Sequence, residues 1–351
     1  MPKDSNGDAG HEIVDNQLAD LEDRIRENYR EAARDVSKDL NAFMDKYIDD
    51  DKRMREKVQA GQISENDYKD WKQGKLFQSE AMDAKVADLT ERMVRADVEA
   101  SAMINGELPQ VYATSYNFAG YKAEAMMQYT GHDYTSFTIV NQDAIRTLST
   151  QDPDLIPWTR KTPIPKDAAW NRQHIQAAIQ QGLLQGDDFS KLSKRLLPVV
   201  NQDATAAMRT ARTAVTGIEN KGRLDATERV VSEGVPMRQR WRCTHDDRTR
   251  DSHILMDGEE IEVGGVFSNG LRYPADPAGD PSEVYNCRCE LEETLEGIDH
   301  SKDAELYEQF MSTEHFEEWQ IIKANQEEKE QAFQQNKRGA PAREEKRKRR
   351  N

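Results

Sequence analysis

Residues 17–59 contain neither glycine nor proline, the two residues that most readily interrupt a helix. Within this stretch apolar side chains recur every three or four positions, with one double step, and charged residues fill the gaps. This is the periodicity of an amphipathic helix, and its length exceeds that of an ordinary globular helix. The pattern therefore predicts a hairpin arm or a coiled-coil-like segment. The apolar positions are Leu21, Ile25, Ala32, Val36, Leu40, Phe43 and Tyr47.

Helix-breaking and capping residues after this stretch predict where further helices begin and end. Gly61 is expected to end the first helix, and Ser64 with Asp67 three positions later has the pattern of a capping box for the next one. Asn105 and Gly106 are expected to stop that second pattern before another helix begins. The first third of the chain is therefore predicted to be helical.

The whole chain is predicted to be mainly α, with a small α+β module. We expect a long N-terminal helical arm, a helical middle, a compact loop-rich C-terminal module, a terminal helix and a basic tail. The predicted regions are a helical arm region (1–130), a linker or irregular segment (131–165), a helical region (166–234), an α+β module (235–292), a charged helix (293–336) and a basic disordered tail (337–351).

Composition narrows the class of protein. The net charge of -16, from 65 acidic and 49 basic residues, argues against a general nucleic-acid binder, because a duplex attracts a basic face. The sequence contains no run of about 20 apolar residues and no apolar N-terminal core of the secretory type, so neither a membrane protein nor an exported one is expected. The odd number of cysteines, 3, favours a reducing cytosolic setting.

Residues with ligand chemistry gather in two short segments, 241–258 and 285–289. Cys243, His245, His253, Cys287 and Cys289 offer the thiolate and imidazole donors that tetrahedral zinc accepts. A set of Cys243, His253, Cys287 and Cys289 resembles structural sites with three cysteines and one histidine. The single residue between the last two cysteines is shorter than the usual spacing, so buried thiols without a metal are the favoured alternative.

Charged side chains crowd the first of these segments. Asp247 and His253 could act as an acid/base pair, because a carboxylate orients an imidazole and raises its basicity. A network of arginines and aspartates that pins loops together is the favoured interpretation, since such networks imitate active sites. Asp257 and Gly258 predict a turn before a strand. The crowded residues are Asp246, Asp247, Arg248, Arg250 and Asp251.

An ordered series of landmarks over residues 170–292 resembles the phage Mu F-like minor head protein family. No single landmark is specific, but their order is. They are Ala211, Arg212 and Thr213; Asn220, Gly222 and Arg223; Trp241; Asp247, Arg248, Arg250 and His253; Asp257 and Gly258; Phe267; Tyr273, Pro274, Asp276 and Pro277; and Asn286, Cys287, Arg288 and Cys289.

The resemblance implies a minor capsid or head morphogenesis protein of a tailed bacteriophage. Such a protein is expected to associate with the portal protein at the portal vertex during procapsid assembly, and to affect DNA packaging or ejection. Scaffolding and major capsid proteins are further candidate partners. The implied location is the virion, at the capsid interior or portal vertex, after assembly in the host cytoplasm. The family is not known for enzymes, so no catalytic residues are expected.

The resemblance also bears on cofactors and fused domains. Some relatives carry two cysteines at the positions of Arg250 and His253, which with Cys287 and Cys289 look like a zinc site. Here Arg250 breaks that pattern, so the expectation is no cofactor, with a structural zinc completed by Cys243 as the alternative. Relatives with a fused toxin domain also exist, but the residues after Cys289 are too few and too polar for one.

Two other function classes stay open from the residues alone. A metal-dependent nuclease or hydrolase would use Asp247, His253 and the cysteines to activate water. A zinc-stabilised DNA-binding module would show a steep salt dependence. The basic tail could bind packaged DNA or an acidic partner through Arg343, Lys346, Arg347, Lys348, Arg349 and Arg350, with a solvated tail as the plain alternative.

Overall fold

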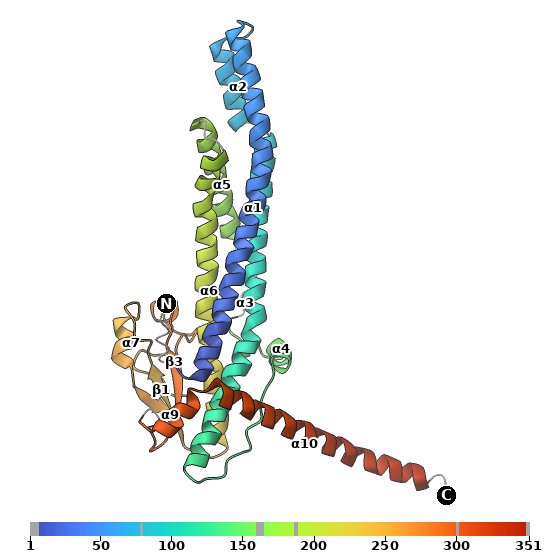
Figure 1. The fold of residues 1–351 in the computed structure, drawn as a ribbon, viewed down its shortest axis with the longest axis vertical. Helices are drawn as coiled ribbons and strands as arrows, with labels where there is room; N and C mark the ends of the chain where they lie inside the picture. The colour runs from blue at the N-terminus through green and yellow to red at the C-terminus, as the bar shows by residue number, and fades with distance from the viewer. Residues whose placement is uncertain (1–6, 78–79, 159–164, 186–188, 300–301, 349–351) are drawn as a thin grey trace. The chain divides into compact units, whose positions relative to one another are not determined.

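A computed structural model describes residues 7–77, 80–158, 165–185, 189–299 and 302–348 (Figure 1). The fold is mainly helical with one small antiparallel sheet, as the sequence predicts. None of the helices among these residues is long and apolar enough to span a bilayer. The elements are α1 (Ala9–Gln59), α2 (Glu65–Phe77), α3 (Glu80–Tyr129), α4 (Gln142–Gln151), the 3-10 turn η1 (Pro153–Leu155), α5 (Pro165–Gln185), α6 (Phe189–Ser232), β1 (Met237–Arg242), α7 (Asp251–Met256), β2 (Glu260–Glu262), α8 (Pro281–Val284), β3 (Glu290–Leu295), α9 (Ala304–Phe310) and α10 (Thr313–Lys348).

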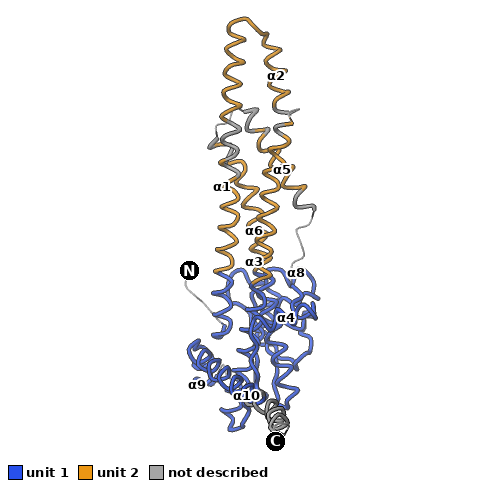
Figure 2. The backbone as a smooth tube through the Cα atoms, turned by 90° about the vertical axis from the view of Figure 1, so that its right-hand side faces the viewer, with its two compact units in different colours: residues 1–19, 107–159, 212–351 blue, residues 20–106, 160–211 orange. Residues whose placement is uncertain are grey.

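The chain divides into two compact units, and α1, α3 and α6 each contribute to both. Unit 2 comprises residues 20–106 and 160–211 and is built from helices that run side by side (Figure 2). Its core is formed by apolar stripes of α1, α3, α5 and α6, and on α1 Tyr29 fills the double step of the sequence pattern. The buried stripe includes Leu21, Ile25, Tyr29, Val86, Leu89, Met93, Ala96, Ile175, Ile179, Leu196 and Ala207.

The turn between α1 and α2 follows the predicted capping chemistry. Gly61 has a positive φ of 65°, a conformation that glycine adopts without strain. The Ser64 hydroxyl accepts a hydrogen bond from the Asp67 backbone N–H at 3.1 Å, and the Asp67 carboxylate accepts one from Ser64 N–H at 2.8 Å. Beyond the cap, Tyr47 of α1 stacks on Trp71 of α2 at 6.2 Å between ring centroids. The predicted capping box is confirmed.

Unit 1 comprises residues 1–19, 107–159 and 212–351, described from residue 7. Here the second half of α3 packs closely on the second half of α6. A Cβ on Gly222 would lie 2.8 Å from the Tyr112 carbonyl oxygen, so only glycine allows this approach. The Tyr112 hydroxyl donates to Asp225 of α6 at 2.7 Å. The glycine that marks the family resemblance is thus a helix-contact residue.

The sheet of unit 1 has the order β2-β1-β3, with both pairs antiparallel. β1 alternates buried and half-buried residues, so Met237, Gln239 and Trp241 face the core. Its register pairs Trp241 with Leu291 and Arg240 with Glu292. The apolar cluster on this face buries Leu224, Trp241, Cys243, Met256, Phe267, Leu271, Tyr273, Ala275, Val284, Cys287, Cys289 and Leu291.

Two helix boundaries differ from the sequence prediction. Asn105 and Gly106 do not stop a helix, because α3 continues through them and through Pro109 to Tyr129. Ile104 and Leu108 on either side are fully buried, and this packing outweighs the roughly 1 kcal/mol that a helical glycine costs. The predicted irregular segment 131–165 also contains α4, which is capped by the Asn141 side chain.

The C-terminal boundary and the division into domains also differ. α10 continues to Lys348 through the segment predicted to be a disordered tail. Arginine, lysine, glutamate and alanine dominate there, and all are good helix formers. The predicted boundary at residue 130 does not separate the compact units, because residues 107–130 pack in unit 1 while 160–211 pack in unit 2. Helical periodicity in sequence does not reveal which part of a long helix packs in which unit.

Candidate functional site

Three of the four predicted zinc ligands form one buried cluster in unit 1. His253 lies on α7, while Cys287 and Cys289 lie just before β3. His253 Nδ1 is 3.3 Å from Cys289 Sγ and 3.7 Å from Cys287 Sγ. All three residues are buried, and their donor atoms lie within 4.8 Å of one another. The donor set therefore fits a zinc ion held by two thiolates and an imidazole.

The segment around the two cysteines is fixed by backbone geometry and by α6. Asn286 has a positive φ of 56°, which asparagine tolerates better than most residues. Its N–H donates to the Thr213 hydroxyl at 3.0 Å. The buried Asn220 amide donates to the Cys289 carbonyl at 3.1 Å, and its oxygen accepts from Leu291 N–H at 2.6 Å. Thr213, Asn220 and Asn286, which belong to the series that resembles the family, thus position the loop that carries Cys287 and Cys289.

His253 is oriented by a carboxylate on its other side. Its Nε2 lies 2.9 Å from Glu283 Oε2, which is the arrangement that commonly orients a metal-bound histidine. Burial opposes the charge of His253, but the hydrogen bond and charge of Cys287 and the charge of Glu283 raise its pKa. Burial likewise opposes the Cys287 thiolate, yet hydrogen bonds with Cys289 and His253 lower its pKa well below the usual range. The predicted partner Asp247 is exposed, so the carboxylate on His253 is Glu283 instead.

Cys243 does not join this cluster, which corrects the predicted set of four ligands. Its sulfur lies 3.9 Å from His245 Nδ1, and Cys243, His245 and Asp257 form a separate group of donors. The cause is local: the Cys243 N–H donates to Asp257 Oδ1 at 2.9 Å as the chain leaves β1. The turn predicted at Asp257 and Gly258 is present, with a Gly258 φ of 82° before β2.

Part of the predicted charged network is present, centred on Asp246 and on Arg288 from the second segment, while Asp247 and Asp251 are exposed. Asp246 receives a two-pronged hydrogen bond from Arg288, with 2.6 Å for the Nη2 contact, and a further one from Arg248 N–H at 3.0 Å. Arg250 donates to the carbonyl of Tyr285, which ties α7 to the cysteine loop. Trp241 packs edge-on against His253 with 5.2 Å between ring centroids. Arg212 is half-buried on α6 beside Thr213.

A larger charged cluster lies in the core of unit 1, and sequence reasoning missed it. Arg223 Nη2 lies 2.7 Å from Asp8 Oδ1, and its Nη1 lies 3.2 Å from Glu293 Oε2. Lys122 Nζ bridges the same two carboxylates at 3.0 Å and 3.1 Å. His11 Nδ1 binds Glu219 Oε1 at 2.7 Å. The acidic run of β3, where alternating glutamates would normally face solvent, was the one available signal.

Burial and neighbouring charges shift the pKa values of two members of this cluster. Burial and the charge of Asp8 raise the pKa of Glu290 to about 8, although Arg223 Nη2 lies 2.8 Å from Glu290 Oε1. Burial opposes protonation of His11, but the charge of Glu219 outweighs it and raises the pKa to about 10. The basic side chains of the cluster are Arg223, Lys122 and His11, and the carboxylates that they contact are those of Asp8, Glu219, Glu290 and Glu293.

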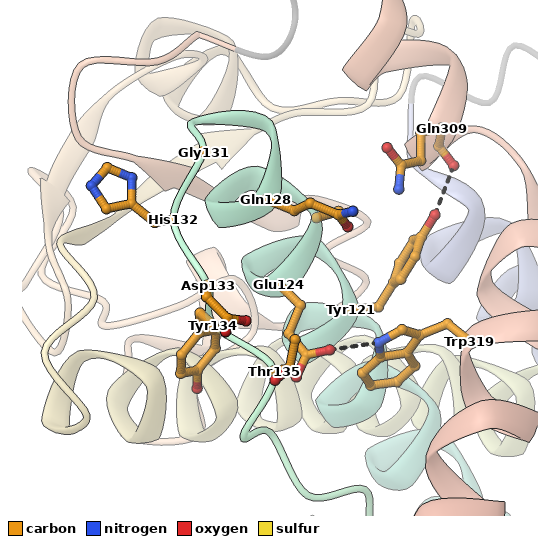
Figure 3. Close-up of a pocket in the computed structure, with 11 residues that line it drawn as sticks. Tyr121, Glu124, Gln128, Gly131, His132, Asp133, Tyr134, Thr135, Gln309 and Trp319 are labelled. Atoms are coloured by element: carbon orange, nitrogen blue, oxygen red, sulfur yellow. Dashed lines mark hydrogen bonds between the residues drawn. The ribbon is translucent and has the colours of Figure 1, made fainter.

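A cavity of about 420 Å³ lies elsewhere in unit 1 (Figure 3). Trp319 Nε1 donates to Glu124 at 2.8 Å across it, and the buried Lys323 pairs with the same carboxylate. Asp133 supplies a further carboxylate to the lining. Aromatic faces beside carboxylates are suited to a basic side chain of another protein. The lining consists of Tyr121, Glu124, Ala125, Gln128, Gly131, His132, Asp133, Tyr134, Thr135, Gln309 and Trp319.

Comparison with known proteins shows which proteins this chain resembles. The profile of the family described as "Phage Mu protein F like protein" matches residues 173–292, which include the buried His/Cys cluster and the Asp246–Arg288 network. The minor head protein GP7 of Bacillus phage SPP1 is 23% identical over 305 residues, covering 85% of this chain and 89% of that protein. Residues 173–292 thus match the Mu F-like family, and most of the chain is similar to a phage minor head protein.

A second relative of this chain has an enzyme's name. The NAD(+)--arginine ADP-ribosyltransferase EFV of Enterococcus faecalis is 25% identical over 253 residues. The match covers 68% of this chain but only 50% of that protein, so this chain spans about half of that relative's length. No solved structure matches the chain significantly. The chain is thus similar both to a phage head protein and to part of a longer protein with an enzyme's name.

Proposed function

We propose that this Mu F-like protein is a structural component of the phage head that docks on the portal protein at the portal vertex during procapsid assembly, and that it affects DNA packaging or ejection. The observation that carries the proposal is the extent of the match to the SPP1 minor head protein, 85% of this chain. That extent exceeds residues 173–292 and takes in helices of both units. The similarity therefore concerns the whole architecture and not the Mu F-like module alone.

The arrangement of the module supports a structural role over catalysis. Asp246, Arg288 and Arg250 are engaged with one another or with loop carbonyls, and Asp247 is exposed away from His253. Hydrolysis by the rival nuclease mechanism would require a base beside water and substrate. The half of the ADP-ribosyltransferase that this chain does not span leaves room there for a separate enzymatic domain. We therefore propose that this chain is not an enzyme.

Unit 2 supplies the docking surface in this proposal. Its helices expose large apolar side chains between charged residues, and such side chains serve as anchors in a groove of a partner. Val98 of α3 is 42% exposed, Leu197 of α6 is 50% exposed and Ile48 of α1 is 49% exposed. The acidic, aromatic cavity of Figure 3 adds a second place for a basic side chain of the same partner.

Copurification with the portal protein from the same phage tests this proposal. The full chain is coproduced with the portal protein, and the complex is analysed by size exclusion with mass determination. Association at a few copies per portal ring is expected, with loss in the double variant Val98→Asp, Leu197→Asp. The matched control is Leu255→Asp, since Leu255 is 87% exposed in unit 1. Binding to scaffolding or major capsid protein instead, or no association, would contradict the portal assignment.

For the cofactor, we infer that a structural zinc binds His253, Cys287 and Cys289. The support is the fit of the buried donors and the carboxylate behind His253. A bound zinc would link α7 to the loop before β3 and so stabilise the module. Treatment with a chelator should lower the melting temperature of wild type but not of Cys287→Ser. An identical melting profile with and without the chelator would exclude this zinc.

The basic C-terminal segment is proposed to bind packaged DNA weakly. Its side chains lie outside the described residues, so the support is charge alone: Arg343, Lys346, Arg347, Lys348, Arg349 and Arg350. Each residue that meets a phosphate releases counterions, so affinity should fall steeply with salt. Truncation after residue 336 should abolish duplex binding measured at low salt. Equal binding by the truncated chain would contradict this role.

A further inference from the structure

Cys243, which the predicted zinc set assigned to the cluster around His253, belongs to a donor group of its own. Cys243, His245 and Asp257 each offer one atom, and these atoms lie within 4.8 Å of one another. Cys243 Sγ is 3.9 Å from His245 Nδ1, and His245 Nε2 is 3.1 Å from Asp257 Oδ2. Donors of one zinc ion sit about 2.0–2.3 Å from it and hence within about 4.6 Å of one another. The 4.8 Å limit is slightly wider than this, and one imidazole binds a given ion through only one of its nitrogens. The His245 ring, whose Nδ1 faces Cys243 and whose Nε2 faces Asp257, therefore has to turn to bring all three donors onto one ion.

Contacts from neighbouring elements hold this group in place. The Cys243 N–H donates to Asp257 Oδ1 at 2.9 Å, leaving Oδ2 facing His245. The Gly258 N–H donates to the Trp241 carbonyl at 2.8 Å, so β1 and the end of α7 are joined on both sides of the group. The Thr244 hydroxyl donates to the carbonyl of Arg288 at 2.5 Å. The loop thus presents its donors from a fixed backbone.

Exposure distinguishes this group from the cluster around His253. The His253 side chain is 1% exposed, whereas that of His245 is 52% exposed and that of Asp257 is 30% exposed. Cys243 itself is buried at 1%. An ion held here would have three protein ligands and a side open to water. That is the format of zinc sites that keep one coordination position free.

We propose that Cys243, His245 and Asp257 form a second zinc-binding site, separate from His253, Cys287 and Cys289, with water as the fourth ligand. Sulfur, imidazole nitrogen and carboxylate oxygen together favour zinc over magnesium or calcium, which prefer oxygen ligands alone. Metal binding there would fasten the loop after β1 to the end of α7. This site does not depend on the zinc proposed at His253.

Metal content of the full chain tests this site. Metal-free protein, kept reduced, is dialysed against Zn²⁺ and its bound zinc is measured by mass spectrometry. Co²⁺ binding is followed in parallel through the thiolate-to-cobalt absorption band. The variants are His245→Ala and Asp257→Asn, the latter keeping an acceptor for the Cys243 N–H. His315→Ala is the matched control, because His315 is an exposed histidine at the start of α10.

The expected result is that wild type and His315→Ala bind one equivalent of zinc more than His245→Ala. Asp257→Asn should weaken that equivalent at least tenfold. If this extra equivalent persists in Cys287→Ser, the second site stands even where the zinc at His253 fails. Equal zinc in His245→Ala and wild type would overturn the proposal. So would a single equivalent lost in both Cys243→Ser and Cys287→Ser, because Cys243 would then complete the site at His253.

Discussion

Different interactions stabilise the interiors of the two compact units. Unit 2 buries apolar helix stripes and pairs its charges on the surface, for example Arg55 with Asp51 at 2.8 Å on α1. Unit 1 instead buries a group of charges in its core, where the side chains of Arg223, Lys122 and Glu293 have no exposure. Apolar stripes tolerate sliding and substitution, whereas a buried ion cluster requires every partner in position.

This difference assigns different tasks to the two units. A cluster that balances its charges only when Asp8, α3, α6 and β3 meet specifies one arrangement of unit 1. Helices with charged outer faces leave unit 2 with a surface able to adapt to another protein. Hydrogen exchange measured peptide by peptide reports the stability of each unit separately.

Arg223→Met should have the largest effect. It leaves Asp8 and Glu293 buried beside a single cation, which costs about 3–5 kcal/mol of unfolding free energy. Exchange protection should collapse in unit 1 and persist in unit 2. Arg238→Met is the control, because Arg238 on β1 is half-exposed and sits 4.0 Å from its acidic neighbours. Equal losses in the two variants would contradict a stabilising buried cluster.

Leu89→Ala should produce the reverse pattern. Leu89 has no exposed surface in unit 2, and truncating such a leucine costs about 2–5 kcal/mol. Protection should fall along the unit 2 parts of α1 and α3 while the sheet of unit 1 keeps its protection. Leu197→Ala, at a half-exposed position of the same unit, should change little. Simultaneous loss in both units would show that they unfold as one.

Raising the pH from 6.5 to 10 should weaken unit 1. The pKa of His11 is raised from 6.5 to about 10, so its contribution is complete below pH 6.5 and is lost as pH rises to 10. The pKa of Glu290 is raised from 4.5 to about 8, so the stability contributed by its protonated form begins to fall above pH 4.5. The part that remains at pH 6.5 is lost as the pH rises to 8. The combined loss is on the order of a few kcal/mol.

Denaturant unfolding of Trp71→Phe, Trp170→Phe protein measures this loss, because the remaining tryptophans lie in unit 1. Glu290→Gln should flatten the part of the slope that ends near pH 8 and leave the part due to His11. A free energy of unfolding that is constant from pH 6.5 to 10 would contradict the raised pKa values of His11 and Glu290.

Glu124→Gln should have an intermediate, local effect. Glu124 accepts hydrogen bonds from Trp319 at 2.8 Å and from Phe137 N–H at 3.1 Å, and it pairs with the buried Lys323. Leaving that lysine without a carboxylate costs about 1–3 kcal/mol. Faster exchange is expected at the start of α10, and Glu314→Gln, at an exposed glutamate of the same helix, should leave exchange unchanged. Unaltered exchange in Glu124→Gln would mean that Glu124 does not stabilise the start of α10.

Arg55→Ala should have the smallest effect. Its partner Asp51 lies one helical turn away and the Arg55 side chain is 60% exposed, so the pair contributes less than about 0.5 kcal/mol. The free energy of unfolding, obtained from the melting curve, should fall by less than about 0.5 kcal/mol. The decrease should be smaller still at high salt. A large drop would mean that surface pairs, and not only apolar stripes, hold unit 2 together.

Local features of the chain were predictable from sequence. The helical period over residues 17–59, the cap at Ser64 and the turn at Gly258 depend on neighbours in the chain, and all three are present. The network around Asp246 was predictable only in part: Arg248 is a local partner, whereas the two-pronged contact comes from Arg288, 42 positions away.

Long-range choices were not predictable. Asp8 meets Arg223 across 215 positions, and no local pattern marks that pairing. Glu283 orients His253 because α8 returns beside α7, whereas sequence proximity pointed to Asp247. Cys243 separates from Cys287 and Cys289 because Asp257 holds its backbone. In the first two cases the deciding contact comes from an element distant in sequence, whereas Asp257 is only 14 positions from Cys243.

The protein composition of assembled heads tests directly whether this chain is a minor component of the phage head. The chain is produced with the structural proteins encoded by the same phage, and purified procapsids and mature heads are quantified by mass spectrometry. We expect the full chain in procapsids at low copy relative to the major capsid protein. The double variant Val98→Asp, Leu197→Asp should lower its incorporation, while Leu255→Asp should not. Heads that lack the chain at both stages would contradict its assignment as a minor head protein.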